Sequence, residues 1–122
     1  MEPAVFESQK VLGSVGRITT LSPASGVMSL VVCSFKASVD AGVPIMMLAH
    51  AMMPALDPHE MTTTSPATYD LLRNEMGFTG LALTDDMEMG AIIKDRSYTD
   101  AAKGSIMAGA DLIEYRSFEQ AR

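Results

Sequence analysis

The chain has 122 residues, of which 48% are hydrophobic and 20% are charged, and its formal net charge is −6. This length forms one domain at most, and the composition is that of a globular protein rather than a disordered one. The acidic balance argues against a nucleic-acid or anionic-membrane partner, since no basic cluster is present to meet phosphate groups. Cys33 stands alone, so neither an internal disulfide nor a zinc site is expected.

The first part of the chain, residues 1–34, is an unplaced N-terminal segment. Glycines, serines and Pro23 between residues 13 and 26 break any helical period, and the apolar run 27–32 predicts one short strand. Residues 35–41 then predict a short helix, which Gly42 ends. The first ten residues lack the basic start and apolar run of a targeting signal. The compartment is therefore unknown, with a cytoplasmic location as the default expectation.

Short apolar runs and helical segments alternate after Gly42. The continuous apolar run 44–49 predicts a buried strand with His50 at its end, and a loop rich in Pro and Thr follows over 52–64. Ser65-Pro66 predicts the start of a helix, with Ser as N-cap and Pro at the first helical position. Gly77 suits the left-handed residue just past the end of that helix.

The second apolar run, 81–83, is too short for a helix and predicts another buried strand, after which Asp85 and Asp86 follow. A helix over 98–108 and a strand over 111–115 complete the pattern. Strand, helix, strand, helix, strand at this spacing predicts an α/β fold with a parallel βαβαβ unit. The two carboxylates then lie at the carboxyl end of the sheet, where catalytic residues collect in such folds.

The stretch 71–91 resembles the signature of glycoside hydrolase family 3, most closely that of its β-N-acetylhexosaminidase branch. The matching positions are Leu71, Leu72, Arg73, Glu75, Gly77, Phe78, Gly80, Thr84 and Asp85. The continuation 86–91 resembles the hexosaminidases rather than the β-glucosidases. The resemblance starts near Phe35, so residues 35–122 are interpreted as a partial family 3 barrel domain.

The resemblance implies a (β/α)8 barrel of the TIM type, which needs eight strands and about 250 residues. The sequence supplies three clear strands, and a fourth is expected near Val31. We therefore interpret it as the C-terminal part of a barrel, from a truncated or frame-shifted gene or from a protein with an unusual N-terminus. Open sheet edges in such a fragment would favour self-association.

The resemblance also implies a retaining mechanism without metal or cofactor, acting on a saccharide. Asp85 would attack the anomeric carbon, and water would release N-acetylglucosamine from a cell-wall or chitin-derived substrate. A lone Asp after a strand is more often a helix cap, and the family match favours the nucleophile. The alternative is a non-catalytic sugar-binding remnant or an inactive gene fragment. A phosphate-binding barrel is a weaker interpretation, because no Gly-rich loop precedes a helix.

Other residues of the same region admit both a functional and a structural role. His50 is a candidate for lining the substrate site or for a structural contact. Met89 and Met87 are candidates for packing beneath a sugar ring or for filling the core. Asp86 is expected to hold the turn after the strand, and Arg73 to make a structural ion pair or carbonyl contact.

The general acid/base is not identified. In the hexosaminidase branch this role falls to a His in an Asp-x-His loop, where the Asp orients the imidazole. Asp57-Pro58-His59 has this spacing, but it lies in a different loop, and a solvated turn is the simpler interpretation.

Overall fold

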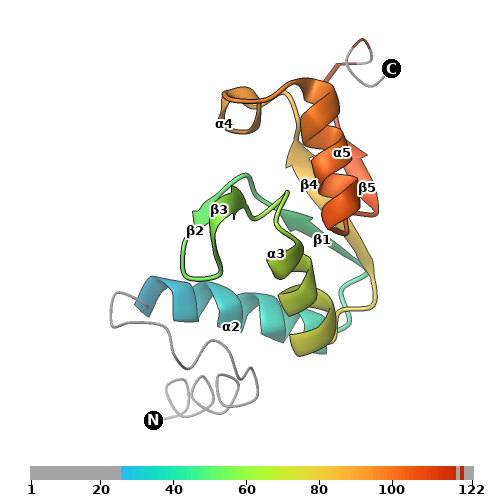
Figure 1. The fold of residues 1–122 in the computed structure, drawn as a ribbon. Helices are drawn as coiled ribbons and strands as arrows, with labels where there is room; N and C mark the ends of the chain where they lie inside the picture. Colours follow the sequence, from blue (N-terminus) through green and yellow to red (C-terminus); the bar gives the residue numbers. More distant parts are fainter. Residues whose placement is uncertain (1–25, 118, 120–122) are drawn as a thin grey trace, which may run out of the picture. The chain divides into compact units, whose positions relative to one another are not determined.

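A computed structural model describes residues 26–117 and 119, with side chains from Val32 onward. Its elements, in chain order, are α2 (Gly26–Asp40), β1 (Ile45–Leu48), β2 (Met52–Met53), β3 (Asp57–Met61), α3 (Pro66–Asp70), the π-helical turn η3 (Leu71–Glu75), β4 (Leu81–Asp86), α4 (Gly90–Ile93), α5 (Tyr98–Ala108) and β5 (Leu112–Glu114) (Figure 1). The chain divides into two compact units, one made of residues 1–43 with 72–78 and the other of residues 44–71 with 79–122. Most of the predicted segment 1–34 lies outside the described residues.

The first unit contains α2, which replaces the strand that the sequence predicts over 27–32. That prediction was wrong, as was the fourth strand near Val31, because the run is helical and continues into the predicted helix 35–41. Val32, Phe35 and Val39 keep the i, i+3, i+7 spacing of one helix face. Among the described residues, no helix combines the length and the apolar character needed to cross a bilayer.

Glycines end the helices of this unit as predicted. At the end of α2, Gly42 has a φ of 79°, and the N–H of Val43 donates to the carbonyl of Ser38, which closes a Schellman-type cap. After η3, Gly77 has a φ of 77°. Here Arg73 donates from Nη1 to the carbonyl oxygen of Phe78 at 3.2 Å and lies over its ring. The structural carbonyl contact predicted for this arginine is confirmed.

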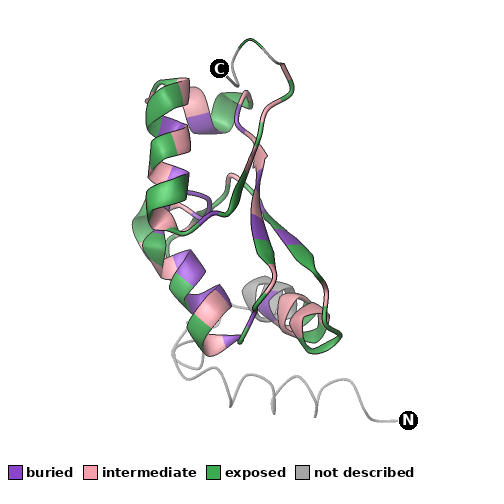
Figure 2. Cartoon of the chain, turned by 90° about the vertical axis from the view of Figure 1, so that its right-hand side faces the viewer, coloured by how far each residue is buried: buried purple, intermediate pink, exposed green. Residues whose placement is uncertain are grey.

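The second unit contains a three-stranded parallel sheet in the order β1-β4-β5. Ile45 lies opposite Leu81 in the β1–β4 pair, and Leu83 lies opposite Leu112 in the β4–β5 pair. Helix α3 connects β1 to β4 and α5 connects β4 to β5, so the predicted βαβαβ order of an α/β fold is confirmed. Because both crossovers advance the sheet in the same direction, both helices lie on the same face (Figures 1 and 2).

Burial alternates along β1 and β4, so the buried strands predicted from the apolar runs are buried on one face only. Met46 and Leu48 of β1 are buried, as are Ala82 and Thr84, their neighbours in β4 (Figure 2). On the other face Ile45, Met47 and Leu81 are exposed, and Ile45 keeps 49% of its surface. Within this unit, α3 and α5 cover one face of the sheet. A continuous apolar run does not reveal whether the layer that covers the other face lies within the same unit.

Two small elements were not predicted. Strands β2 and β3 form an antiparallel pair inside the expected loop 52–64, and α4 precedes the predicted polar loop 94–97. Neither has a period long enough to be recognised in the sequence, since β2 has two residues and α4 has four. A buried cluster of Met87, Ile92 and Ala101 holds α4 against α5.

Helix α5 runs from Tyr98 to Ala108, as predicted, and Gly109 ends it with a φ of 134°. A Cβ atom at Gly109 would lie 2.9 Å from Cβ and Cγ of Tyr69 in α3. This glycine therefore serves two purposes, since it allows the left-handed turn into β5 and leaves room for the buried Tyr69 ring.

Replacement of Gly109 with Ala tests this close approach. Positive φ and the clash with Tyr69 together predict a loss of about 2–4 kcal/mol in the free energy of unfolding, measured by urea titration. Gly104→Ala is the matched control, because its Cβ would meet only a Thr64 methyl at 3.5 Å. That change inside α5 is expected to stabilise by about 0.5–1 kcal/mol. Equal effects of the two substitutions would contradict the packing described here.

The exposed face of the sheet predicts self-association, because β1 and β5 are edge strands and expose the apolar side chains of Ile45, Met47 and Leu112. The average mass in light scattering is expected to rise with protein concentration, and Ile45→Lys should suppress the rise. Ile106→Lys is the control, since Ile106 on α5 is equally exposed, at 49%. A monomer at all concentrations, with a sharp unfolding transition, would refute this expectation.

Candidate functional site

The carboxyl end of β4 carries the two carboxylates expected there. The strand extends through Asp86, three residues beyond the predicted 81–83, so Asp85 and Asp86 belong to its last residues rather than to the loop after it. The register with β5 shifts between Leu83 and Asp86, so this stretch of β4, which contains Asp85, has one residue more than the facing stretch of β5, as in a β-bulge. Bulges of this kind re-aim side chains and are common beside active sites.

Two backbone groups of Glu114 in β5 hold this end of β4. The N–H of Glu114 donates to Oγ1 of Thr84 at 3.0 Å, so this buried hydroxyl replaces a carbonyl in the ladder. The N–H of Met87 donates to the carbonyl oxygen of Glu114 at 2.9 Å. These two bonds keep β4 attached to β5 on both sides of the bulge.

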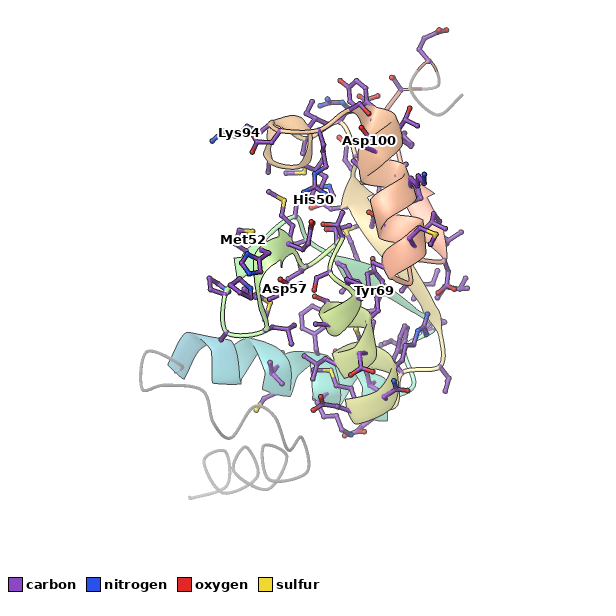
Figure 3. The ribbon with its side chains drawn as sticks, in the orientation of Figure 1. His50, Met52, Asp57, Tyr69, Lys94 and Asp100 are labelled. Carbon is purple, nitrogen blue, oxygen red and sulfur yellow. The ribbon has the colours of Figure 1, made fainter. Side chains whose placement is uncertain are left out.

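His50 holds the same segment from the side of β1. It follows β1 at the carboxyl end of the sheet, and its Nε2 lies 2.9 Å from the carbonyl oxygen of Asp86 (Figure 3). Its Nδ1 lies 2.8 Å from Oγ1 of Thr63, which is fully buried. Both ring nitrogens therefore have protein partners, and the substrate contact expected for His50 stays a prediction.

The two adjacent carboxylates have different local partners. Oδ1 of Asp85 accepts the N–H of Asp86 at 2.8 Å. Oδ1 of Asp86 accepts the N–H of Glu88 at 2.9 Å, and its Oδ2 lies 3.7 Å from Nε of Arg116. The turn-holding role predicted for Asp86 is confirmed, while the nucleophilic role of Asp85 stays a prediction.

An ionic cluster beside the strand end joins the loops that follow β4 and β5. Glu88 accepts hydrogen bonds from the N–H and hydroxyl of Ser117 and from Nε of Arg116, the last at 3.2 Å. The Ser117 hydroxyl is the main reason why the pKa of Glu88 lies below its usual value, and Arg116 lowers it further.

The two methionines after β4 differ in burial. Met87 is fully buried in the cluster with Ile92 and Ala101, which confirms core filling for this residue. Met89 keeps 42% of its surface and precedes α4. Its packing against a sugar ring remains a prediction.

Asp57 and His59, which have Asp-x-His spacing, lie in β3, so the turn expected for them is a strand. Oδ1 of Asp57 accepts the N–H groups of His59 and Glu60, and the ring of His59 is exposed. Oδ2 accepts the hydroxyl of Ser65 at 2.6 Å, a bond that contributes most to lowering the pKa of Asp57. Ser65 is the N-cap residue of α3 as predicted, but its hydroxyl makes no cap bond because it donates to Asp57.

Sequence reasoning missed Thr63, Glu88 and Arg116. Thr63 lies in a run of three threonines within the predicted loop 52–64, although all three are buried. The only sequence feature that pointed to such a role is the run of hydroxyl groups itself, since buried hydroxyl groups form hydrogen bonds. Arg116 and Glu88 are 28 residues apart, and only the pairing of β4 with β5 brings them together.

Comparison with known proteins gives the same family along most of the chain. Residues 7–118 match the model of the glycosyl hydrolase family 3 N-terminal domain. This match extends across the predicted boundary between residues 1–34 and 35–122. The boundary stays a prediction. A β-hexosaminidase of Nitrosomonas eutropha is 35% identical over 79 residues, which cover 65% of this chain and 23% of that protein. A β-hexosaminidase of Vibrio cholerae is 31% identical over 80 residues, or 24% of its length.

Solved structures show the same relationship. A family 3 β-N-acetylglucosaminidase from Paenibacillus sp. str. FPU-7 has a TM-score of 0.66 and 34% identity, and the match covers 70% of this chain and 17% of that one. A β-N-acetylhexosaminidase from Beutenbergia cavernae has a TM-score of 0.66 and 31% identity, with 73% and 26% covered. The chain thus spans about a quarter of the length of the curated relatives it matches.

The cluster at Glu88 predicts a specific loss of stability in acid. The pKa of the Glu88 carboxyl is lower in the folded chain than in the unfolded one, where it is about 4.3. The stability that this carboxylate contributes is therefore fully present above the unfolded pKa and is lost as the pH falls through the folded pKa. The urea midpoints of the wild type and Glu88→Gln should therefore differ most above about pH 5 and converge in acid. Ser117→Ala should give a smaller change in the same direction, since the backbone N–H remains. Curves that stay parallel at all pH values would contradict this role.

Proposed function

Because the chain belongs to glycosyl hydrolase family 3, we propose that it is part of a retaining β-N-acetylhexosaminidase whose nucleophile is Asp85. The observation that carries the proposal is the position of this carboxylate. It lies at the carboxyl end of β4, the central strand of the parallel sheet, at a bulge that is held from both neighbouring strands. The carboxyl end is where the catalytic groups of such sheets gather.

The proposed chemistry has two displacements at the anomeric carbon. An oxygen of the Asp85 carboxylate forms a bond to that carbon while the glycosidic bond breaks, and a general acid protonates the departing oxygen. Water then attacks the glycosyl ester, gives its proton to the same group acting as base, and releases the sugar with retained configuration. The bond from the N–H of Asp86 fixes one carboxylate oxygen and leaves the other available for attack.

The substrate in this proposal is a saccharide with terminal N-acetylglucosamine, of cell-wall or chitin origin. Its support is the resemblance of residues 71–91 to the hexosaminidase branch, together with the names of the relatives. We also propose that the sheet is a segment of a (β/α)8 barrel. The parallel order β1-β4-β5 with both helices on one face supports this, since an apolar face without helices suits a barrel interior.

A non-catalytic sugar-binding remnant is the second candidate. The observation that favours it is the sequence itself, in which the only Asp-x-His spacing is Asp57-Pro58-His59, and these residues lie in β3, where Asp57 accepts the N–H groups of His59 and Glu60. Neither His59 nor Asp57 is assigned a catalytic role here. The 122 residues by themselves are expected to hydrolyse an aryl N-acetylglucosaminide slowly or not at all, since acid/base help is worth about 10²–10⁴-fold.

A hybrid enzyme tests the proposal. When the N-terminal part of a family 3 hexosaminidase is grafted onto Phe35, the hybrid is expected to hydrolyse an aryl N-acetylglucosaminide. Asp85→Ala should lower kcat by about 10³-fold or more, because the covalent step loses its nucleophile. Azide should partly restore turnover and give a glycosyl azide of inverted configuration, since it attacks from the side that the carboxylate has left.

Asp86→Ala is the matched control, because the neighbouring carboxylate holds the following turn. It should impair folding or rate far less than Asp85→Ala. An active hybrid that tolerates loss of Asp85 and fails without Asp86 would refute the assignment. A correctly folded hybrid with no activity would favour the non-catalytic candidate.

A further inference from the structure

The backbone ladder between β1 and β4 ends before it reaches the catalytic end of the sheet. The last pair in register is Leu48 with Thr84, one residue short of Asp85. Beyond this point the connection between the two strands is a side chain, the His50 imidazole, which bonds the carbonyl oxygen of Asp86 at 2.9 Å. A ring nitrogen thus takes over the function of a backbone donor at the level of the carboxylates.

The partners of the imidazole determine which nitrogen carries the proton. A carbonyl oxygen only accepts, so Nε2 of His50 must be protonated to bond Asp86. In the neutral ring, Nδ1 then accepts from the Thr63 hydroxyl at 2.8 Å. The carbonyl oxygen of Ala49 also lies 2.9 Å from the Thr63 hydroxyl. When that hydroxyl donates to His50 instead, the Ala49 carbonyl still accepts from the Thr62 hydroxyl. The neutral Nε2–H form therefore satisfies every group in this network.

The support behind the ring is buried and fixed. Thr63 is fully buried, and its carbonyl oxygen accepts the hydroxyl of Tyr69 at 2.8 Å, which anchors it to α3. The imidazole is therefore held at Nδ1 by a rigid partner and presents Nε2–H in a defined direction. Second partners of this kind orient a histidine more strongly than a single bond does.

One further bond connects the ring to the Asp85 carboxylate. The carbonyl oxygen of Asp86 is bonded by His50 from the side of β1 and by the N–H of Met89, at 3.1 Å, from the following turn. The N–H of Asp86 donates to Oδ1 of Asp85 at 2.8 Å. We propose that His50 is a positioning residue, which orients the Asp85 carboxylate through the backbone of Asp86. The catalytic meaning of this arrangement rests on the proposed function, whereas the hydrogen-bond relay is tested without any turnover.

His50→Gln and His50→Asn form a matched pair for this test in the 122-residue chain. The amide nitrogen of Gln reaches about as far as Nε2 and keeps a donor for the Asp86 carbonyl, whereas Asn reaches only the Nδ1 position. The measured quantity is the hydrogen-exchange rate of the Asp86 amide by NMR. The Leu81 amide, which donates to Pro44 at the opposite end of β4, is the internal control for general loss of stability.

The relay predicts that His50→Asn speeds Asp86 exchange by about three- to tenfold, the effect of one lost hydrogen bond, with Leu81 unchanged. His50→Gln should restore most of the protection. Equal exchange in both variants, or equal acceleration at Leu81 and Asp86, would overturn the positioning role.

A measurement on the unmodified chain covers the case in which a variant does not fold. The ring of His50 is expected to show an Nε2–H signal protected from exchange, with Nδ1 unprotonated in the neutral ring. An Nδ1–H tautomer or an unprotected Nε2–H would overturn the proposal. An unexpected tautomer or exchange rate would contradict the His50 relay without affecting the assignment of Asp85 as nucleophile. An inactive hybrid would contradict the proposed function without affecting the relay.

Discussion

The site depends on how the last residues of β4 are held after regular pairing ends. On one side, Glu114 bonds the Thr84 hydroxyl and the Met87 amide; on the other, His50 bonds the Asp86 carbonyl. An unpaired strand end at the edge of a sheet would fray, because its backbone groups would exchange partners with water. These bonds allow a bulge to exist without loss of order. Asp85 and Asp86 are adjacent in sequence, but successive side chains of a strand point to opposite faces, and the two carboxylates have different partners.

Local patterns predicted much of the fold correctly. The period and the terminal glycine of α5 were sufficient to place Tyr98–Ala108, because a capped helix is largely encoded by its own residues. The run 27–32 was assigned wrongly, since an apolar run rich in Val fits a strand or a helix until its neighbours are considered. One-sided burial of the strands was also missed, because it depends on which layers the chain contains.

The candidate site was predictable only in part. The position of Asp85 followed from a strand followed by carboxylates, and from the resemblance to a family signature. The roles of Glu114 and Arg116 were not predictable, since each lies about 30 residues from its partner and joins it only when β4 and β5 pair. Thr63 meets His50 across the antiparallel β2–β3 pair, which the sequence analysis does not predict. A threonine in a polar loop has no sequence feature that distinguishes a solvated hydroxyl from a buried partner of His50.

The central claim is that Asp85 forms the covalent bond to the sugar, and trapping that bond tests it most directly. The hybrid would be incubated with a fluorinated N-acetylglucosaminyl fluoride, which glycosylates the enzyme quickly and is released slowly, and its peptides analysed by mass spectrometry. The account predicts one sugar on the peptide that contains Asp85, located at that residue by fragmentation. A sugar on Asp86, or on any residue outside this strand end, would contradict it.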